Sequence, residues 1–506
     1  MKDKKLIIFN TAVTYGRMFL TVLISLYTSR VVLGALGIID FGLYNLVAGV
    51  ITLLSFLNGS MTVSTQRFLS YEMGKKNAEQ VNRVFNASVI IHLFIGFIII
   101  LLAETVGLWF LLNYLKIPSD RFNAALFIYH FAVFSFFITV LNVPFQAVLN
   151  ARQNMLAISI VNIIETLLKL TVAILISFTT YDKLKFYGFL MFTIPIIVLI
   201  IYVTYTKNRY SETTFKIVKD NELYKELSSF AGWNLFGSIA SIAKNQGNAV
   251  LLNIFFGPAL NAAYAVANQV NGQLSFFSQS IFRASNPQII QNYGSDKKTE
   301  MFQLMYQTTK FAYFIIYLLA LPLILRMDFV LDLWLKKVPD FAAIFCILIL
   351  INTMIDIISY PLMTAAQATG KIKYYQMCMG TLLLLNLPIS YILLSVGMKA
   401  ITVVICNITI TFLALWLRLW FLNRMMSFPF ITWVKKCFSK IAILTLVSAP
   451  LGMIINGLFP LTLSGFVLNS TSVIVVSIMI FYQLLENGEK KYIHSTFNSI
   501  KKKINI

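Results

Sequence analysis

The sequence predicts an all-α polytopic membrane protein with about fourteen transmembrane helices, arranged as two pseudo-symmetric helical bundles around a central cavity. Three observations lead to this fold class. Hydrophobic residues make up 58% of the 506 residues and charged residues only 12%, whereas soluble domains average about 45–50% and 25%. The apolar stretches are long enough for helices rather than for barrel strands. Part of the first half of the chain also repeats in the second half.

Fourteen segments are candidates for membrane-spanning helices, because a spanning helix needs about 20 mostly apolar residues. In order, they are 8–34, 40–62, 84–112, 123–146, 156–178, 186–206, 229–255, 261–282, 303–325, 340–363, 375–396, 400–422, 438–458 and 464–485. The segment 261–282 is the least hydrophobic. This composition excludes a disordered chain, a secreted disulfide scaffold and a soluble enzyme with a loose membrane anchor.

The basic residues predict that both termini lie in the cytoplasm. With this orientation, 27 of the 41 Lys and Arg residues fall in inner segments and 8 in outer segments. An excess of Lys and Arg is typical of cytoplasmic loops. The formal charge of +21 is therefore explained by topology, and no nucleic-acid partner is expected.

The chain contains no motif for catalysis or for a bound metal. There is no GxSxG, Walker loop, HExxH or CxxC sequence, and no acidic cluster that would hold Mg²⁺. We therefore expect no enzyme activity, no catalytic residue, no metal site and no cofactor. Any driving force for transport should be a proton or sodium gradient, the membrane potential, or the gradient of the ligand itself.

An internal repeat relates the two halves of the chain. Residues 37–76 align without a gap on residues 257–296 at an offset of 220, with eight identities, where chance gives about two or three. The identical residues of the first copy are Gly37, Tyr44, Val50, Leu54, Ser55, Phe56, Ser60 and Gly74. An offset of six helices keeps the orientation, which indicates a parallel repeat about an axis along the membrane normal.

The repeat and the segment count together predict the domain organisation. It comprises a six-helix bundle at 1–206, a cytoplasmic linker at 207–228, a second six-helix bundle at 229–422, and two additional helices with a basic cytoplasmic tail at 423–506.

Basic residues at bilayer depth are the first candidates for a binding site. Arg17 lies twelve residues beyond Lys5, about 18 Å along a helix, which is too deep for easy access to the interface and favours a cavity. Arg30 lies near the outer end of the same segment, where reaching for the interface and binding are equally good explanations.

The middle of the segment 229–255 is unusually polar. It contains Lys244, Asn245, Gln246, Gly247 and Asn248 in succession. Polar groups at this depth need protein or water partners. Helix packing could explain one amide or the glycine, but not Lys244 beside three amides, so we predict a substrate cavity here.

A polar stripe runs along the segment 261–282. Asn268, Asn271 and Ser275 recur at helical spacing and therefore share one face. Such a stripe could hydrogen-bond a polar ligand or hold neighbouring helices together.

Other charged residues within spans have two explanations each. Glu165 and Lys169 are four residues apart and can pair on one helix face, either as a structural ion pair or as a site of ion coupling. Asp356 could bind a proton or cation, or hydrogen-bond a neighbouring helix. Lys310 and Arg418, near inner helix ends, are expected to snorkel to the interface.

Several local sequences resemble a known family. Residues 29–37 and 40–44, the inner loop at 65–76, and Leu331-Asp332-Leu333-Trp334-Leu335 are similar to bacterial polysaccharide flippases. These belong to the multidrug/oligosaccharidyl-lipid/polysaccharide exporter superfamily, and the span count, orientation and two-half arrangement extend the resemblance over the whole chain.

The resemblance implies a fold and a function. The fold is two bundles that face each other across a cavity. The function is transfer of undecaprenyl-pyrophosphate-linked oligosaccharide repeat units, such as those of O-antigen or lipopolysaccharide, from the inner to the outer leaflet of the bacterial cytoplasmic (inner) membrane by alternating access. Arg17, Arg30 and Lys244 would meet the pyrophosphate. The residues implied for the glycan space are Asn245, Gln246, Asn248, Asn268, Asn271 and Ser275.

One departure narrows the implied substrate. The related peptidoglycan-precursor flippases also carry central Arg residues on their second and eighth helices, whereas here these spans contain none before Arg67 and Arg283. A surface-polysaccharide substrate is therefore favoured. The implied partners are the lipid-linked oligosaccharide, membrane lipids and other membrane proteins of polysaccharide assembly.

Two other functions remain open from the sequence. An ion-coupled multidrug exporter of the same superfamily would need acidic and aromatic cavity residues, which the cationic first and seventh spans do not favour. A membrane polysaccharide polymerase or ligase would need a large outer loop with Arg, His or acidic residues, and the outer segments are short.

Overall fold

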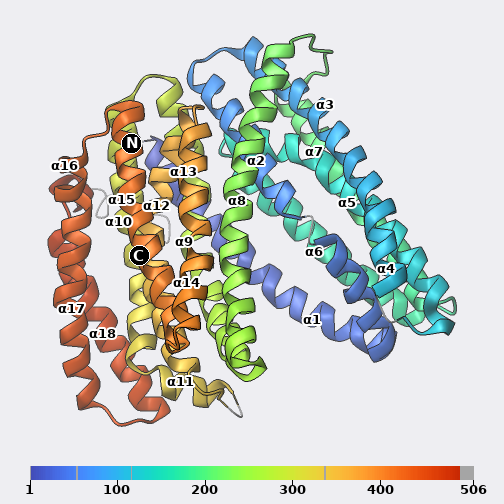
Figure 1. The fold of residues 1–506 in the computed structure, drawn as a ribbon. Coiled ribbons are helices and arrows are strands. Elements are labelled where there is room, and N and C mark those ends of the chain that lie inside the picture. The colour runs from blue at the N-terminus through green and yellow to red at the C-terminus, as the bar shows by residue number, and fades with distance from the viewer. Residues whose placement is uncertain (1, 53–54, 115–116, 336–337, 491–506) are drawn as a thin grey trace, which may run out of the picture. The chain divides into compact units, whose positions relative to one another are not determined.

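The computed structural model describes residues 2–52, 55–114, 117–335 and 338–490, and this part of the chain is built from helices without strands (Figure 1). The longer helices are α1 Lys2–Thr52, α2 Ser55–Gly74, α3 Ala78–Leu102, α5 Phe122–Ala151, α6 Met155–Phe178, α7 Lys183–Arg209, α8 Asn221–Phe256, α9 Pro258–Gly294, α10 Lys298–Leu325, α12 Ala342–Ala368, α15 Ile401–Met426, α17 Ser439–Leu458 and α18 Leu463–Leu484. The shorter ones are α4 Leu108–Tyr114, α11 Met327–Trp334, α13 Lys373–Leu384, α14 Asn386–Ser395 and α16 Phe430–Trp433. Single turns of other helix types lie at Ala103–Gly107, Ser119–Arg121, Ser211–Thr213 and Val434–Phe438.

The predicted all-α membrane class is confirmed, with about fourteen helices. Eleven helices of the described residues are long and apolar enough to cross a membrane. The predicted spans 229–255 and 261–282 are helical, as are the described residues of 40–62 (residues 53–54 lie outside them), but the three spans are not among these eleven. The spans 229–255 and 261–282 carry the polar run and the polar stripe, and such residues lower the mean hydropathy of a helix without preventing it from forming.

The offset of 220 recurs in the backbone. The φ angle is positive at Gly37 (77°) and at its counterpart Gly257 (81°). Glycine adopts this conformation without the steric cost that a side chain would bring. Gly37 kinks α1, and Gly257 separates α8 from α9.

Helices α2 and α9 also end in the same way. In each, the chain closes with a Schellman motif whose left-handed residue is Lys76 (φ 59°) or Asp296 (φ 58°). The next helices, α3 and α10, then begin at positions that are again 220 residues apart. The repeat therefore extends from single residues to helix boundaries.

The two helix ends approach each other closely at matched glycines. A Cβ atom on Gly74 would overlap the backbone carbonyl of Gln291, and one on Gly294 would overlap that of Tyr71. Residues 71 and 291 are themselves related by the offset, so the contact is reciprocal. Only a residue without a side chain fits at either position.

The chain divides into two compact units. The N-terminal unit comprises Ile8–Ser238 together with Ile290–Lys297, and the C-terminal unit comprises Ile239–Ile289, the chain from Lys298 onward and the first few residues. Between the two halves of the chain, the units divide within helix α8, after Ser238, rather than in the predicted linker. The predicted domain boundaries themselves stay a prediction.

In the N-terminal unit, α5 packs against α2, α3 and α7, and α6 packs against α7 (Figure 1). The part of α1 around Val32 joins α6 and α7 in one apolar cluster, which includes Ala173, Ile176 and Tyr187. These β-branched and small residues recur at helical spacing along their helices, which fixes the face that each helix buries.

The predicted linker is held against the N-terminal unit. Asn86 of α3 donates to the Thr214 carbonyl (3.0 Å) and accepts from the Lys216 amide (3.0 Å). Arg152 pairs with the buried Glu212, and Arg83 pairs with Asp220. The segment between α7 and α8 is thus a fixed strap rather than a free loop.

In the C-terminal unit, α12 packs against α10 and α15, while α17 and α18 pack on each other and on α10. These last two helices, drawn in red in Figure 1, correspond to the predicted additional pair. Tyr313 and Tyr317 of α10 hydrogen-bond Thr445 and Ser448 of α17 at 2.7 Å each.

Candidate functional site

A charged cluster lies inside the C-terminal unit, built from three helices. Arg418 of α15 pairs with Asp356 of α12 (Nη1 to Oδ1, 3.6 Å), and Lys244 of α8 interacts electrostatically with both. Lys244 and Arg418 are each only 8% exposed. Within the described residues, Lys244 has no carboxylate close enough for an ion pair.

The guanidinium of Arg418 is incompletely satisfied. It interacts with the hydroxyl of Tyr375 and lies near Tyr360, yet its Nε and Nη1 atoms are buried without a hydrogen-bond partner in the described structure. Buried cationic donors are costly unless they are paired. The arrangement, two cations beside one carboxylate, suits an additional anion.

The expectation that Arg418 snorkels is wrong. Its side chain is held between α12 and α13 instead of reaching the interface. Arg418 lies eight residues before the end of α15, about 12 Å along the helix. The depth argument that singled out Arg17 would also have identified Arg418.

The polar run of α8 divides between two faces. Lys244 and Asn248, four residues apart, point into the unit, whereas Asn245 and Gln246 are exposed. A Cβ on Gly247 would overlap the side chain of Leu387, so the glycine permits α14 to approach α8.

This approach creates a buried amide pair. Asn386 Nδ2 donates to Asn248 Oδ1 at 2.6 Å, and both residues are fully buried. Asn248 also interacts with Tyr264 of α9. The structure thus gives Asn248 protein partners and leaves Asn245 and Gln246 as the accessible amides of the run.

The stripe on α9 is formed as the spacing predicts. Asn271 Oδ1 accepts hydrogen bonds from Ser275 (3.2 Å) and from Thr353 of α12 (2.6 Å). Asn268 bonds the carbonyl of Tyr264 through its amide nitrogen and is exposed. Asn271 therefore joins two helices, while Asn268 remains accessible.

A second polar group lies in the N-terminal unit. Glu165 and Lys169 form the ion pair expected from their spacing, at 2.6 Å. Tyr202 of α7 interacts electrostatically with Glu165 and with Arg17 of α1, and its hydroxyl accepts from Gln146 (3.2 Å). Arg17 thus lies in a polar region that four helices contribute to.

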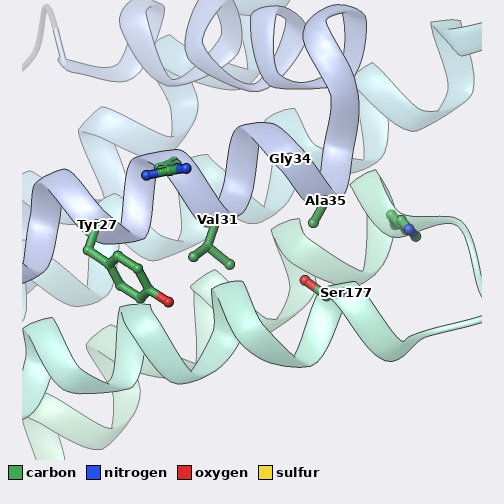
Figure 2. Close-up of a pocket in the computed structure, with 7 residues that line it drawn as sticks. Tyr27, Val31, Gly34, Ala35 and Ser177 are labelled. Carbon is green, nitrogen blue, oxygen red and sulfur yellow. The ribbon is translucent and has the colours of Figure 1, made fainter.

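Arg30 lies in a cavity of about 580 Å³ with residues of α1, α6 and the start of α7. Figure 2 shows Tyr27, Val31 and Ala35 projecting from α1 towards the helix that carries Ser177. Lys183 completes the polar lining. Arg17 and Arg30 therefore belong to the N-terminal unit, and Lys244 belongs to the C-terminal unit.

Arg67 is a buried cation with a structural environment. It is 3% exposed and lies 4.5 Å from the ring centre of Phe68, 4.8 Å from that of Tyr71 and 5.4 Å from that of Phe230. Burial lowers the pKa of Arg67 to about 10, a shift that Glu226 opposes. The side chain therefore stays charged at neutral pH and binds the aromatic rings around it.

Lys310 and Glu104 each form an ion pair in the structure. Lys310 does not snorkel, because it forms a buried ion pair with Glu489 (2.6 Å). Glu104 pairs with His130 of α5 (2.9 Å). Among the described residues, no group of three or more His, Cys, Asp or Glu side chains could hold a metal ion.

The comparison with family models decides the family. The model of a family described as "Polysaccharide biosynthesis protein" matches residues 4–293, which is more than half of the chain. The chain belongs to this family. A model of the MatE family matches residues 249–392, and the chain is accordingly a multi-pass membrane transporter of the multidrug/oligosaccharidyl-lipid/polysaccharide exporter (MOP) superfamily. The comparison with curated proteins found no significant match.

Solved structures of this superfamily share the fold of this polysaccharide biosynthesis family member. A crystal structure described as MATE in the bent conformation aligns with a TM-score of 0.74 at 13% identity, over 84% of this chain and 97% of that one. A MOP-superfamily transporter from Pyrococcus furiosus, described as having a binding pocket of reverse polarity, gives 0.67 at 15%, over 84% and 96%. The transporter ClbM in complex with Rb⁺ gives 0.67 at 17%, over 85% and 97%.

Proposed function

We propose that this protein transfers undecaprenyl-pyrophosphate-linked oligosaccharide repeat units across the cytoplasmic membrane, by alternating access, for surface polysaccharide biosynthesis. The observation that carries the proposal is the charge of the buried cluster in the C-terminal unit. Lys244 and Arg418 both lie near the carboxylate of Asp356, which forms an ion pair only with Arg418 in the described structure. The Nε and Nη1 atoms of Arg418 are buried there without a hydrogen-bond partner. The family match supports the same function.

A pyrophosphate group fits this chemistry. It carries negative charge on several oxygens, and a guanidinium matches that geometry through parallel hydrogen bonds. A drug cation would be repelled by the same cluster. In the N-terminal unit, we assign Arg17 and Arg30 to the pyrophosphate as well.

The glycan needs uncharged hydrogen-bonding groups. Asn245, Gln246 and Asn268 are exposed and can supply both donors and acceptors. Asn271 and Ser275 are partly exposed on the same stripe as Asn268. Asn248 supports this surface from behind through its bond with Asn386.

Ion coupling is assigned to the two carboxylates of the polar regions. The side chain of Asp356 is 40% exposed and that of Glu165 is 32% exposed, so a proton or sodium ion can reach either. Protonation of Asp356 would leave Arg418 and Lys244 without their counter-charge, which links ion binding to affinity for an anionic substrate. We place the protein in the bacterial inner membrane with both termini in the cytoplasm, beside other membrane proteins of polysaccharide assembly.

The test is the fate of lipid-linked glycan in cells that carry Lys244→Ala or Arg17→Ala. Lys399→Ala is the matched control, because it removes an exposed lysine from the same unit as Lys244. We expect undecaprenyl-linked repeat units to accumulate in the inner leaflet and surface polysaccharide to disappear in the first two strains only, at equal protein levels. Normal surface polysaccharide with new sensitivity to cationic drugs would instead assign the protein as a multidrug exporter.

A further inference from the structure

We infer that the cavity lined by Arg30 and Lys183 binds a phosphate-bearing lipid headgroup, on the side of the N-terminal unit that is predicted to face outward. For the identity of the ligand, this inference rests on the proposed function. We call the site the α1–α6 cavity, after the two helices that supply most of its lining: Tyr27, Arg30, Val31, Gly34 and Ala35 from α1, and Ser177 from α6, with Lys183 at the start of α7.

The size of the α1–α6 cavity suits a headgroup. Its volume of about 580 Å³ lies within the range of ligand pockets in proteins, roughly 300–1,000 Å³. Figure 2 shows the hydroxyl groups of Tyr27 and Ser177 on the two helices that border it. The site thus offers two cations and two hydroxyl donors around one space.

The two cations of the cavity are not neutralised by the protein. Within the described chain, neither Arg30 nor Lys183 forms an ion pair or a side-chain hydrogen bond. The nearest carboxylate in sequence is Asp182, which caps α7 and accepts from Arg121 (3.1 Å). Arg121 also binds the carboxylate of Asp40 through two nitrogen atoms.

The ion pairs of Arg121 leave Arg30 and Lys183 as the cations of this region that can bind a ligand. Arg121 occupies both local carboxylates, so the cavity keeps a surplus of two positive charges. Surplus cations that converge on one cavity attract a dianionic group such as a phosphate or pyrophosphate.

The position of the cavity points to a lipid-linked ligand. Its α1 residues lie just before the kink at Gly37, on the side predicted to face outward. Tyr27, Phe178 and Tyr181 are 58%, 81% and 78% exposed there, and exposed aromatic residues are typical of the membrane interface. A headgroup in the cavity would therefore have its acyl or prenyl chain at the level of the bilayer.

The test measures binding of farnesyl pyrophosphate to the purified full-length protein. We expect Arg30→Gln/Lys183→Gln to weaken binding by about tenfold or more, since each lost charge-assisted contact is worth about that factor. Lys185→Gln is the matched control, because this lysine begins the same helix but does not line the cavity, and it should bind as the wild type does.

A second variant keeps both cations and fills the space. A Cβ atom on Gly34 meets nothing within 4 Å, so Gly34→Leu adds bulk to the cavity without straining the helix. It should weaken farnesyl pyrophosphate binding as the charge variant does. Unchanged binding in Gly34→Leu, or in a correctly folded Arg30→Gln/Lys183→Gln protein, would overturn the inference.

Competition identifies the source of the headgroup. Displacement by inorganic pyrophosphate, but not by phosphatidylglycerol vesicles, supports the pyrophosphate of the substrate. Displacement by phosphatidylglycerol supports the same site with a membrane phospholipid as its ligand. If neither competitor displaces the probe, the headgroup is not what the cavity recognises, and the inference is overturned.

The proposed function can fail independently. If the cavity binds the probe and the protein moves no lipid-linked oligosaccharide, the function is refuted and the site remains. If transport is intact and both cavity variants bind and transport as the wild type does, the site is refuted and the function remains.

Discussion

Replacing Glu489 by Gln should loosen the carboxy-terminal helices from the rest of the C-terminal unit. The side chains of Lys310 and Glu489 are 3% and 5% exposed and lie 2.6 Å apart. Glu489 also accepts a hydrogen bond from the Glu486 amide (3.0 Å). Its carboxylate therefore ties the segment after α18 to α10.

The magnitude follows from the burial of both charges. A glutamine can keep the hydrogen bond but leaves Lys310 as a buried, unpaired ammonium, which costs about 3–5 kcal/mol. For a unit of this size, that lowers the melting temperature by roughly 10 °C. Removing both charges in Lys310→Met/Glu489→Leu should restore stability to within about 1–2 kcal/mol of the wild type.

The assay is thermal unfolding of the purified protein, followed by size-exclusion chromatography with fluorescence detection. Lys440→Gln is the control, because its pair with Glu486 is longer (3.4 Å) and its side chains are 22% and 42% exposed. This pair should contribute less than about 1 kcal/mol. Equal melting temperatures for Glu489→Gln and Lys440→Gln would refute the reasoning. So would a double variant no more stable than Glu489→Gln.

Two further predictions concern helix contact and pH. Gly74→Ala should destabilise the N-terminal unit by about 1–3 kcal/mol, because the new Cβ meets the backbone of Gln291. Gly232→Ala is the control and should not destabilise the unit in this way, because there is open space around Gly232. The melting temperatures of the two variants are compared with that of the wild type. Burial alone would raise the pKa of Glu486, but Lys440 and neighbouring lysines outweigh it and lower the pKa. The ionised form is therefore favoured in the fold, and its contribution is present above about pH 4.3 and lost as pH falls through the folded pKa. Lowering the pH from 6 to 3 should thus reduce the free energy of unfolding of the wild type more than that of Glu486→Gln, as measured by denaturation at each pH. An equal loss of stability in both proteins would contradict the assignment.

What the sequence predicts well is local. The spacing of Glu165 and Lys169 defines their pair, because two side chains four residues apart on a helix meet whatever surrounds them. The length of the apolar stretches identifies most of the spans, because it too depends only on the local sequence. The repeat at Gly37 and Gly257 is visible because both copies need the same backbone conformation.

What the sequence does not reveal depends on helices that meet only in the fold. Arg418 and Asp356 are 62 residues apart on different helices, and no periodicity links them. Glu489 reaches Lys310 across an even longer separation. In both cases the sequence alone places a basic residue near a helix end at the interface, because spacing does not identify its carboxylate partner.

The charge balance of the C-terminal cluster favours a ligand over a purely structural role. A structural pair needs one cation for one carboxylate, and Arg418 with Asp356 already satisfies that. Lys244 is a second buried cation on a third helix, without an ion pair of its own in the described structure. Burying it would be costly in a protein whose only requirement were stability, since an apolar residue would pack at least as well. A carrier of anions has a reason to keep that charge, because the substrate supplies the missing counter-charge for part of each cycle. Removing Lys244 should therefore reduce transport while leaving the melting temperature unchanged or raised, a combination that a structural lysine would not produce.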